Sequence, residues 1–412
     1  MFIGLVMIHE WGHFIVARRN GVDTEEFGLG FPPRLWGRKL RKKQGDNTLY
    51  SFNLLPLGGF VKMKGEHDYD EEPGSFGAAS LKAKTKIMLA GVGLNLLTAI
   101  VLFTIVAIAG MPKLISKAQF GEEQFTVKSD TKIIRNDVRV SFVDPDSPAD
   151  KAGVKAGDNI KSISILNTCN TSMPECAKSA PITIPTADVL KEKTKDFASK
   201  TVAINLLRNK EMLTVQAHIR TKVEVDSFNK AHHCNDQNYK GNDAQCMGYF
   251  GIVPIDYTVQ RSTWSAPVVA VGLSAQLTKL TFKGLWSAIK GLGSTIAGGV
   301  TGNKVARQKG QTQASEQVSG PVGIFFVLKE GARQGFVFIL FIVAVISLTL
   351  AIMNVLPIPA LDGGRLYLML YYRKVLHKVL PQKTEERIVG GSFAALMLLF
   401  VLITVVDVKR FF

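Results

Sequence analysis

The sequence is poor in charge and in cysteine. Charged residues make up 20% of its 412 residues, against about 25% in ordinary soluble domains, and the mean hydropathy is +0.14. Four cysteines exclude a disulfide-dense miniprotein, and 46% hydrophobic residues exclude a disordered chain. Acidic residues are outnumbered 34 to 50 by basic ones, a net charge of +16. That balance suits nucleic acid, anionic lipid or basic cytoplasmic loops of a membrane protein.

Long uncharged runs decide between these classes. Three runs of about 20 apolar residues are long enough to cross a hydrocarbon core as helices, namely Ile87–Gly110, Phe336–Pro357 and Ile388–Val406. A fourth run, Met1–Ala17, is apolar except for His9, Glu10 and His13. Ionisable groups inside a span are costly and mark a functional site. A signal peptide is the alternative for this end, but a basic start and a small-residue cleavage site are lacking.

The loops between these runs predict the topology. Residues 18–86 and 358–387 are rich in lysine and arginine, which places both in the cytoplasm and residues 111–335 outside with both termini. All four cysteines fall in the outer segment. An oxidising compartment favours two local disulfides, Cys169–Cys176 and Cys234–Cys246, although four cysteines allow three pairings.

The first run carries the sequence His9-Glu10-Trp11-Gly12-His13, which is H-E-x-x-H. On a helix, positions i and i+4 share a face, so both imidazoles can bind one ion. Zinc favours imidazole nitrogen, and the neighbouring glutamate can take a proton from metal-bound water. A chance pentapeptide is the alternative, but three ionisable groups in an apolar run need something to offset their cost.

A catalytic zinc needs a third protein ligand. The best candidate is Asp362, which follows the third long run in the stretch from Asn354 to Gly364. Two prolines and two glycines break the helix there, and irregular backbone at membrane depth is tolerated where it lines a cavity or is buried in protein. An ordinary helix end with a capping aspartate is the alternative.

These motifs together resemble the site-2 protease family of intramembrane zinc metalloproteases, in its bacterial branch. The resemblance rests on H-E-x-x-H, on N-x-x-P-x-P-x-L-D-G, and on the stretches Gly91–Asn95, Leu55–Met63 and Val318–Gly323. It implies one Zn²⁺ per chain, with His9, His13 and Asp362 as ligands and Glu10 as general base. The residues assigned to substrate binding are Asn354, Pro357, Pro359, Gly91, Asn95, Tyr50, Phe52 and Asn53.

A short β element is predicted in the first cytoplasmic loop. Leu49–Leu54 alternates in part and precedes a Pro/Gly-marked bend. A protease acts on extended backbone, so an exposed strand edge there could pair with an unwound substrate. A hairpin that only caps the helices is the alternative. Gly28–Phe31 is assigned to the same membrane-associated element.

The outer segment predicts a separate domain. Val138–Val143 and Val202–Leu207 are β-rich, and Ser147-Pro148 followed by Gly153 is typical of a short capped helix. This pattern looks like the start of a PDZ domain in bacterial proteases. The family's bacterial branch carries two such domains, whereas this segment has room for about one. Binding of exposed peptide ends and a size filter over the active site are both open, and the filter is slightly favoured.

The remaining outer residues predict a helix on the membrane surface. Trp264–Val300 is semi-apolar with spaced lysines, and Thr301–Gln317 is a polar linker. A fifth span is the alternative, disfavoured by the lysines and glycines. Only eight residues precede His9, so either the first helix is half-spanning or the natural start lies earlier.

The predicted protein is an α-helical polytopic membrane protein with about four transmembrane helices, a membrane-associated β element and an extracytoplasmic PDZ-like α+β domain. Its segments are 1–18, 19–86, 87–110, 111–255, 256–335, 336–364, 365–387 and 388–408. The predicted function is cleavage of single-span membrane proteins in the bacterial cytoplasmic membrane, with the lipid bilayer as surroundings and without nucleic acid. The alternative is a non-catalytic adaptor with a structural metal, for which His67 is a conceivable fourth ligand. A transporter is disfavoured because no repeat or paired broken helices are present.

Overall fold

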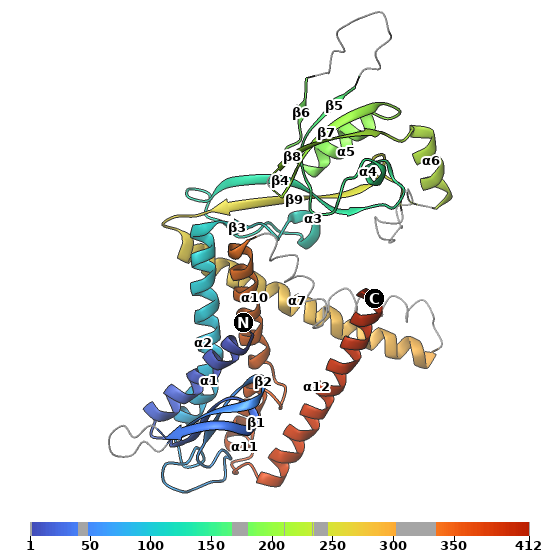
Figure 1. Ribbon diagram of the computed structural model, residues 1–412. Coiled ribbons are helices and arrows are strands. Elements are labelled where there is room, and N and C mark those ends of the chain that lie inside the picture. The colour runs from blue at the N-terminus through green and yellow to red at the C-terminus, as the bar shows by residue number, and fades with distance from the viewer. Residues whose placement is uncertain are drawn as a thin grey trace, which may run out of the picture. The chain divides into compact units, whose positions relative to one another are not determined.

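The computed structural model describes residues 2–39, 48–166, 180–209, 211–232, 234, 246–301 and 335–411. The chain divides into two compact units. One comprises Met1–Met111, Glu122–Thr131 and Ser262–Phe412, and the other comprises Pro112–Gly121 and Lys132–Arg261. Figure 1 shows the helices of the first unit and the sheet of the second. Cys169, Cys176, Val318–Gly323 and residues 302–317 of the predicted linker lie outside the described residues.

The helices of the first unit follow the uncharged runs of the sequence. Within the described ranges, three are long and apolar enough to cross a membrane: α2 (Leu81–Ala109), α10 (Phe336–Val355) and residues Gln382–Val405 of α12 (Gln382–Phe411). The helix with the H-E-x-x-H motif, α1 (Phe2–Arg19), is 18 residues long and is not in this set. Three of the four expected spans therefore meet both requirements.

Helix α2 packs against both α1 and α10. A Cβ at Gly12 of α1 would lie 2.6 Å from the carbonyl oxygen of Ala90, so glycine lets the two backbones approach closely. On the other side, the rings of Phe103 and Phe341 lie 5.6 Å apart, and Ser347 Oγ donates to the carbonyl of Asn95 at 2.8 Å. This packing places the middle of α2 beside the motif of α1.

The predicted helix over Trp264–Val300 is confirmed as α7 (Ala266–Thr301). At 36 residues it is long enough to cross a membrane, but it is not among the described helices that are also apolar enough, which agrees with the choice against a fifth span. Its start is capped by Asp130, whose carboxylate accepts from Ser265 N–H at 3.0 Å and Ser265 Oγ at 2.6 Å. The last helix before α12 is the short α11 (Asp362–Lys374).

The predicted β element is a pair of antiparallel strands, β1 (Thr24–Lys39) and β2 (Leu49–Met63). Strand β1 contains Gly28–Phe31, as expected, and Leu29 pairs with both Phe52 and Gly59 across register shifts. Several large apolar side chains of this pair are exposed: Phe31, Leu35, Trp36, Phe52, Leu54 and Leu55. An exposed apolar surface of this kind suits a membrane-associated element.

The second unit is built on one sheet with the order β3-β9-β4-β5-β7-β8, and β6 pairs with β5. The strands are β3 (Met111–Pro112), β4 (Lys132–Val143), β5 (Asn159–Ile165), β6 (Ile182–Thr183), β7 (Thr201–Arg208), β8 (Glu211–His218) and β9 (Ile252–Arg261). The helices are α3 (Lys117–Phe120), α4 (Pro148–Lys151), α5 (Ala187–Asp196) and α6 (Lys222–Ala231). Its core contains Val138, Ile160, Leu190, Ile204 and Leu206.

Local predictions for this unit are confirmed. Strands cover both β-rich runs, and α4 begins at Pro148 with Ser147 Oγ accepting from Asp150 N–H. Gly153 follows with a φ of +76°. A disulfide joins Cys234 and Cys246, with Cα atoms 5.8 Å apart. The unit runs on to Arg261, beyond the predicted end at residue 255, because β9 continues along β4.

Candidate metal centre

Three side chains from distant parts of the chain converge in the first unit. Nε2 of His9 lies 2.8 Å from Oδ2 of Asp362, and Nε2 of His13 lies 3.1 Å from the same oxygen. The two imidazole nitrogens are 3.1 Å apart. In the part of the chain that the structure describes, no other group of His, Cys, Asp and Glu gathers its ligand atoms this way.

The helical spacing of the motif brings the two histidines of the cluster together. His9 and His13 lie one turn apart on the buried face of α1, with exposed fractions of 7% and 6%, whereas Trp11 between them is exposed. Two buried histidines on one face of an apolar helix therefore point in one direction.

Asp362 reaches the same place because the chain turns sharply after α10. Helix α10 ends at Val355, and Asp362 is the first residue of α11. A Cβ at Gly363 would lie 2.5 Å from the carbonyl oxygen of Val355, and one at Gly364 would collide with that of Ile358. The two glycines thus allow the close fold that brings the carboxylate to the histidines.

The other ring nitrogen of each histidine is also engaged. Nδ1 of His13 lies 2.8 Å from the carbonyl oxygen of Ile87, which can only accept, so Nδ1 carries a proton and the neutral imidazole has its lone pair on Nε2. Nδ1 of His9 lies 3.2 Å from the side-chain amide of Asn95. With the amide oxygen toward the ring, His9 would present its Nε2 lone pair in the same way.

The donor set fits zinc. Two nitrogens bound at about 2.0–2.1 Å in tetrahedral geometry lie about 3.3 Å apart, close to the 3.1 Å between the two Nε2 atoms. Asn95 is fully buried, and its Oδ1 has no hydrogen-bond partner among the described residues. A protonated Nδ1 on a metal-bound His9 would supply that missing partner.

Glycine is required next to this cluster. A Cβ at Gly91 would lie 2.5 Å from Nε2 of His13 and 2.6 Å from Cε1 of His9. Gly91 and Asn95 were predicted to bind substrate. The structure places both against the imidazoles, because α2 packs directly on the motif face of α1, and their contact with substrate stays a prediction.

Glu10 is anchored from an unexpected side. Its Oε2 accepts a hydrogen bond from Val61 N–H of β2 at 3.1 Å. The sequence held no signal for this contact, because it joins a helix residue to a backbone group fifty-one positions along the chain. Strand β2 therefore fixes the carboxylate of Glu10, the residue that directly follows His9.

The other residues predicted to bind substrate differ in how exposed they are. Asn354 is half-buried on the last turn of α10, with Pro357 and Pro359 in the turn that follows. Phe52 is 46% exposed on the strand pair. Asn53, in contrast, is buried: its side chain is 2% exposed, and its Nδ2 donates to the carbonyl of Gly30 at 3.0 Å.

Tyr50 packs among aromatic rings, with centroids 6.1 Å from Phe14 and 6.2 Å from Phe27. The side chains of Asn53 and Tyr50 thus hold the strand pair together and attach it to α1. Alternation along β2 would place Tyr50 and Phe52 on one face and Asn53 on the other, and substrate binding by these residues stays a prediction.

A buried ion-pair network holds the elements that carry the site. Asp68 accepts from Lys84 Nζ of α2 at 2.6 Å and from Arg373 Nε of α11 at 2.8 Å. Burial acts to raise the pKa of Asp68, but hydrogen bonds from Arg373 and Lys84 outweigh it and lower the pKa below its usual value. His67 lies 3.3 Å from Glu385 and takes no part in the cluster.

Comparison with known proteins finds relatives along nearly the whole chain. Residues 1–399 match a family model described as peptidase family M50. A protein of Clostridium acetobutylicum named "Putative zinc metalloprotease" is 30% identical over 409 residues, covering 98% of this chain and 94% of its own. Proteins with the same designation from Clostridium perfringens and a Nostoc species are 27% and 26% identical, covering 99% and 95% of this chain and 96% and 90% of their own.

Proposed function

Because the chain belongs to peptidase family M50, the site-2 protease family, we propose that this membrane zinc protease cleaves its substrates within the bilayer. The convergence of His9, His13 and Asp362 carries the proposal. These three side chains would hold one zinc ion per chain. The bacterial cytoplasmic membrane is the proposed location, with residues 111–335 on its outer side, because the basic loops belong in the cytoplasm.

Bound zinc supplies an acidified water and a Lewis acid for the scissile carbonyl. The protein's own side chains supply the proton transfer. Glu10 takes the proton of the attacking water and passes it to the leaving nitrogen. The hydrogen bond from Val61 N–H keeps its carboxylate in one orientation, which reduces the reorganisation needed during proton transfer.

Substrate binding is assigned to the β1–β2 pair and the turn after α10. A transmembrane helix must unwind before its peptide bonds can be attacked, and an exposed strand edge can hold the unwound segment by strand addition. The exposed apolar side chains of this pair, such as Phe52 and Leu54, suit contact with apolar substrate residues. Asn354 is proposed to hold the substrate backbone or the developing oxyanion.

The proposed substrates are membrane proteins with one transmembrane helix. Single-span membrane proteins are proposed because one helix can enter between the spans and unwind without dismantling a bundle. The adaptor alternative needs a closed structural zinc site, usually with four protein ligands. Among the described residues three converge, and His67 is engaged with Glu385, which favours an open catalytic position.

Replacement of Glu10 by glutamine tests this assignment. Glu10→Gln removes the proton acceptor but none of the three proposed ligands, so zinc content is expected to stay at one per chain while cleavage of a tagged single-span substrate falls to background. Glu71→Gln is the matched control, because Glu71 is exposed in the loop between β2 and α2. Turnover by Glu10→Gln at the rate of the Glu71→Gln variant would refute the role of Glu10.

A further inference from the structure

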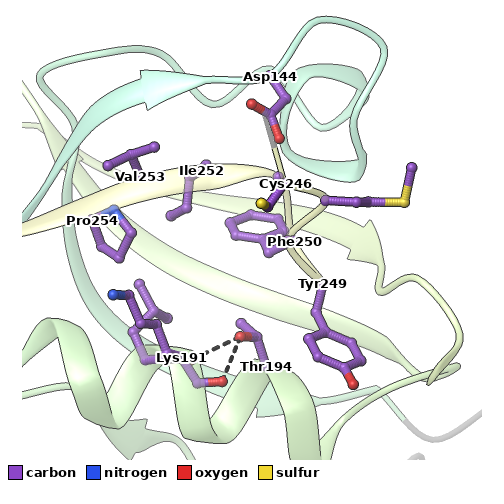
Figure 2. A pocket seen from close by; sticks show the side chains of 13 residues that line it. Asp144, Lys191, Thr194, Cys246, Tyr249, Phe250, Ile252, Val253 and Pro254 are labelled. Carbon is purple, nitrogen blue, oxygen red and sulfur yellow. Dashed lines mark hydrogen bonds between the residues drawn. The ribbon is translucent and has the colours of Figure 1, made fainter. Parts of the chain in front are cut away.

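The large sheet of the second unit has one face that does not belong to its core. Core side chains such as Val138 and Val140 alternate along each strand with side chains of the opposite face. Figure 2 shows this alternation on β9, where Pro254 lies on the side of α5 and Val253 lies across the strand. We call the face with Val253 the open face. It carries Arg135, Asp137 and Arg139 of β4, Lys161 of β5, and Ile255 and Tyr257 of β9.

The open face has a surplus of positive charge. The carboxylate of Asp137 is 5% exposed and lies 2.9 Å from Nε of Arg135 and 2.8 Å from Nζ of Lys161. Nη2 of Arg139 lies 4.0 Å from the same carboxylate. The guanidinium of Arg139 is also stacked over the ring of Tyr257, 3.9 Å from its centroid. Three cations around one carboxylate favour an anionic partner.

Large apolar side chains are exposed beside these cations. Ile255 of β9 is 46% exposed and pairs with Arg139, and Ile134 of β4 is 53% exposed. A register shift between Ile133 and Arg135 adds one residue to β4, and this bulge takes Ile134 out of the regular alternation. Surfaces that combine apolar side chains with cations bind membranes through buried apolar area and through attraction to anionic lipids.

The strands of the open face follow directly on a membrane-spanning helix. Helix α2, which is long and apolar enough to cross a membrane, ends at Ala109, and β3 begins at Met111 and pairs with β9. Strand β9 ends at Arg261, and the N–H of the next residue, Ser262, donates to the carbonyl of Ala107 in α2 at 2.9 Å. Only a few residues of chain therefore separate these strands from the end of α2, so a lipid surface is within their reach.

We infer that the open face lies on the membrane surface at the end of α2 and binds anionic lipid headgroups. Ile134 and Ile255 enter the headgroup region, and Arg135, Arg139 and Lys161 interact with the lipid phosphates. Each basic residue near an anionic membrane surface adds to this attraction. The inference concerns a surface apart from the metal centre and holds whether or not the chain is a peptidase.

Tryptophan fluorescence of the purified full-length protein in lipid vesicles tests this contact. Ile255→Trp places a tryptophan on the open face, and the matched control Val223→Trp places one on α6, where Val223 is 79% exposed. Lipids with brominated acyl chains quench tryptophan at short range, and the signal of the wild type is subtracted. Ile255→Trp should lose most of its added fluorescence in brominated vesicles, and Val223→Trp should keep it.

The position of the bromine tests the preference for anionic lipid. The vesicles contain phosphatidylcholine with a minor fraction of phosphatidylglycerol, and the bromine is carried either by the phosphatidylglycerol or by an equal fraction of the phosphatidylcholine. Brominated phosphatidylglycerol should quench Ile255→Trp more strongly. Adding Arg135→Gln should lower this preference by about fivefold, the contribution of one basic residue near an anionic surface. Adding Lys222→Gln, which removes the same charge from an exposed position of α6, should leave it unchanged.

Thermal unfolding first matches each variant to the wild type, so that a difference in quenching reports on the contact with lipid. Equal quenching of Ile255→Trp and Val223→Trp, or no quenching of Ile255→Trp because water or a protein segment covers the open face, would overturn the inference. Equal quenching by the two brominated lipids, or the same preference with Arg135→Gln as with Lys222→Gln, would overturn the assignment of anionic headgroups.

Discussion

Removal of the Asn95 side chain is expected to weaken zinc binding without removing a ligand. Asn95 is fully buried, and its side-chain amide faces Nδ1 of His9 at 3.2 Å. Partners of this kind orient the imidazole and raise its basicity, and their loss typically reduces metal affinity or activity about 10–100-fold. Asn95→Ala should therefore lose zinc to a chelator at a correspondingly lower chelator concentration.

The controls separate this effect from a packing defect. Thr98→Ala removes a hydroxyl less than one turn away, which among the described residues donates to the carbonyl of Leu94 alone, so its zinc affinity should match the wild type. Asn95→Asp keeps an acceptor for Nδ1–H and should retain more zinc than Asn95→Ala. The assay is zinc content after equilibration with graded chelator. Wild-type zinc retention by Asn95→Ala, or weaker retention by Asn95→Asp than by Asn95→Ala, would refute the reasoning.

Two further predictions concern the packing around the site. Gly91→Ala should abolish zinc binding, because its Cβ would lie 2.5 Å from Nε2 of His13, whereas Gly93→Ala, with open space around it, should bind zinc normally; equal zinc content in the two variants would contradict this. Asp68→Asn should cost roughly 3–5 kcal/mol of stability, because it leaves buried Lys84 without its anion. The folded-state pKa of Asp68 lies below its unfolded value, so this contribution is fully present above the unfolded pKa and is lost as the pH falls through the folded one. Thermal unfolding in detergent should therefore separate wild type from Asp68→Asn at neutral pH and bring them together in acid, and a gap that persists in acid would argue against the charge of Asp68 as the cause.

The elements with a strong periodic or compositional signal could be predicted from the sequence. Uncharged runs located α2, α10 and α12, and the i, i+4 histidines located the face of α1 that carries the cluster. The start of α2 was placed too late, at Ile87 instead of Leu81. The apolar run was predicted to begin after the lysines at 82, 84 and 86. Lys84 is nevertheless buried within the helix, because its ammonium group donates to Asp68 and to the carbonyl of Gly77.

The contacts that complete the site could not be predicted. Asn95 with His9, Val61 with Glu10 and Ile87 with His13 each join residues far apart in sequence. Such pairs depend on how helices and strands pack, and residue type alone does not distinguish a buried amide that orients a ligand from one that binds substrate. Asn53 and Asn95 were assigned to substrate binding with the family resemblance, and the structure adds their contacts with Gly30 and His9.

Cleavage of a tagged single-span substrate by the purified protein tests the central claim most directly. We would compare wild type, wild type with a zinc chelator, and Asp362→Asn, and identify the fragments by mass spectrometry. The account predicts that only untreated wild type cuts, and that the cut lies within the apolar stretch of the substrate. Cleavage that persists with the chelator or in Asp362→Asn, or a cut confined to residues outside the apolar stretch, would contradict it.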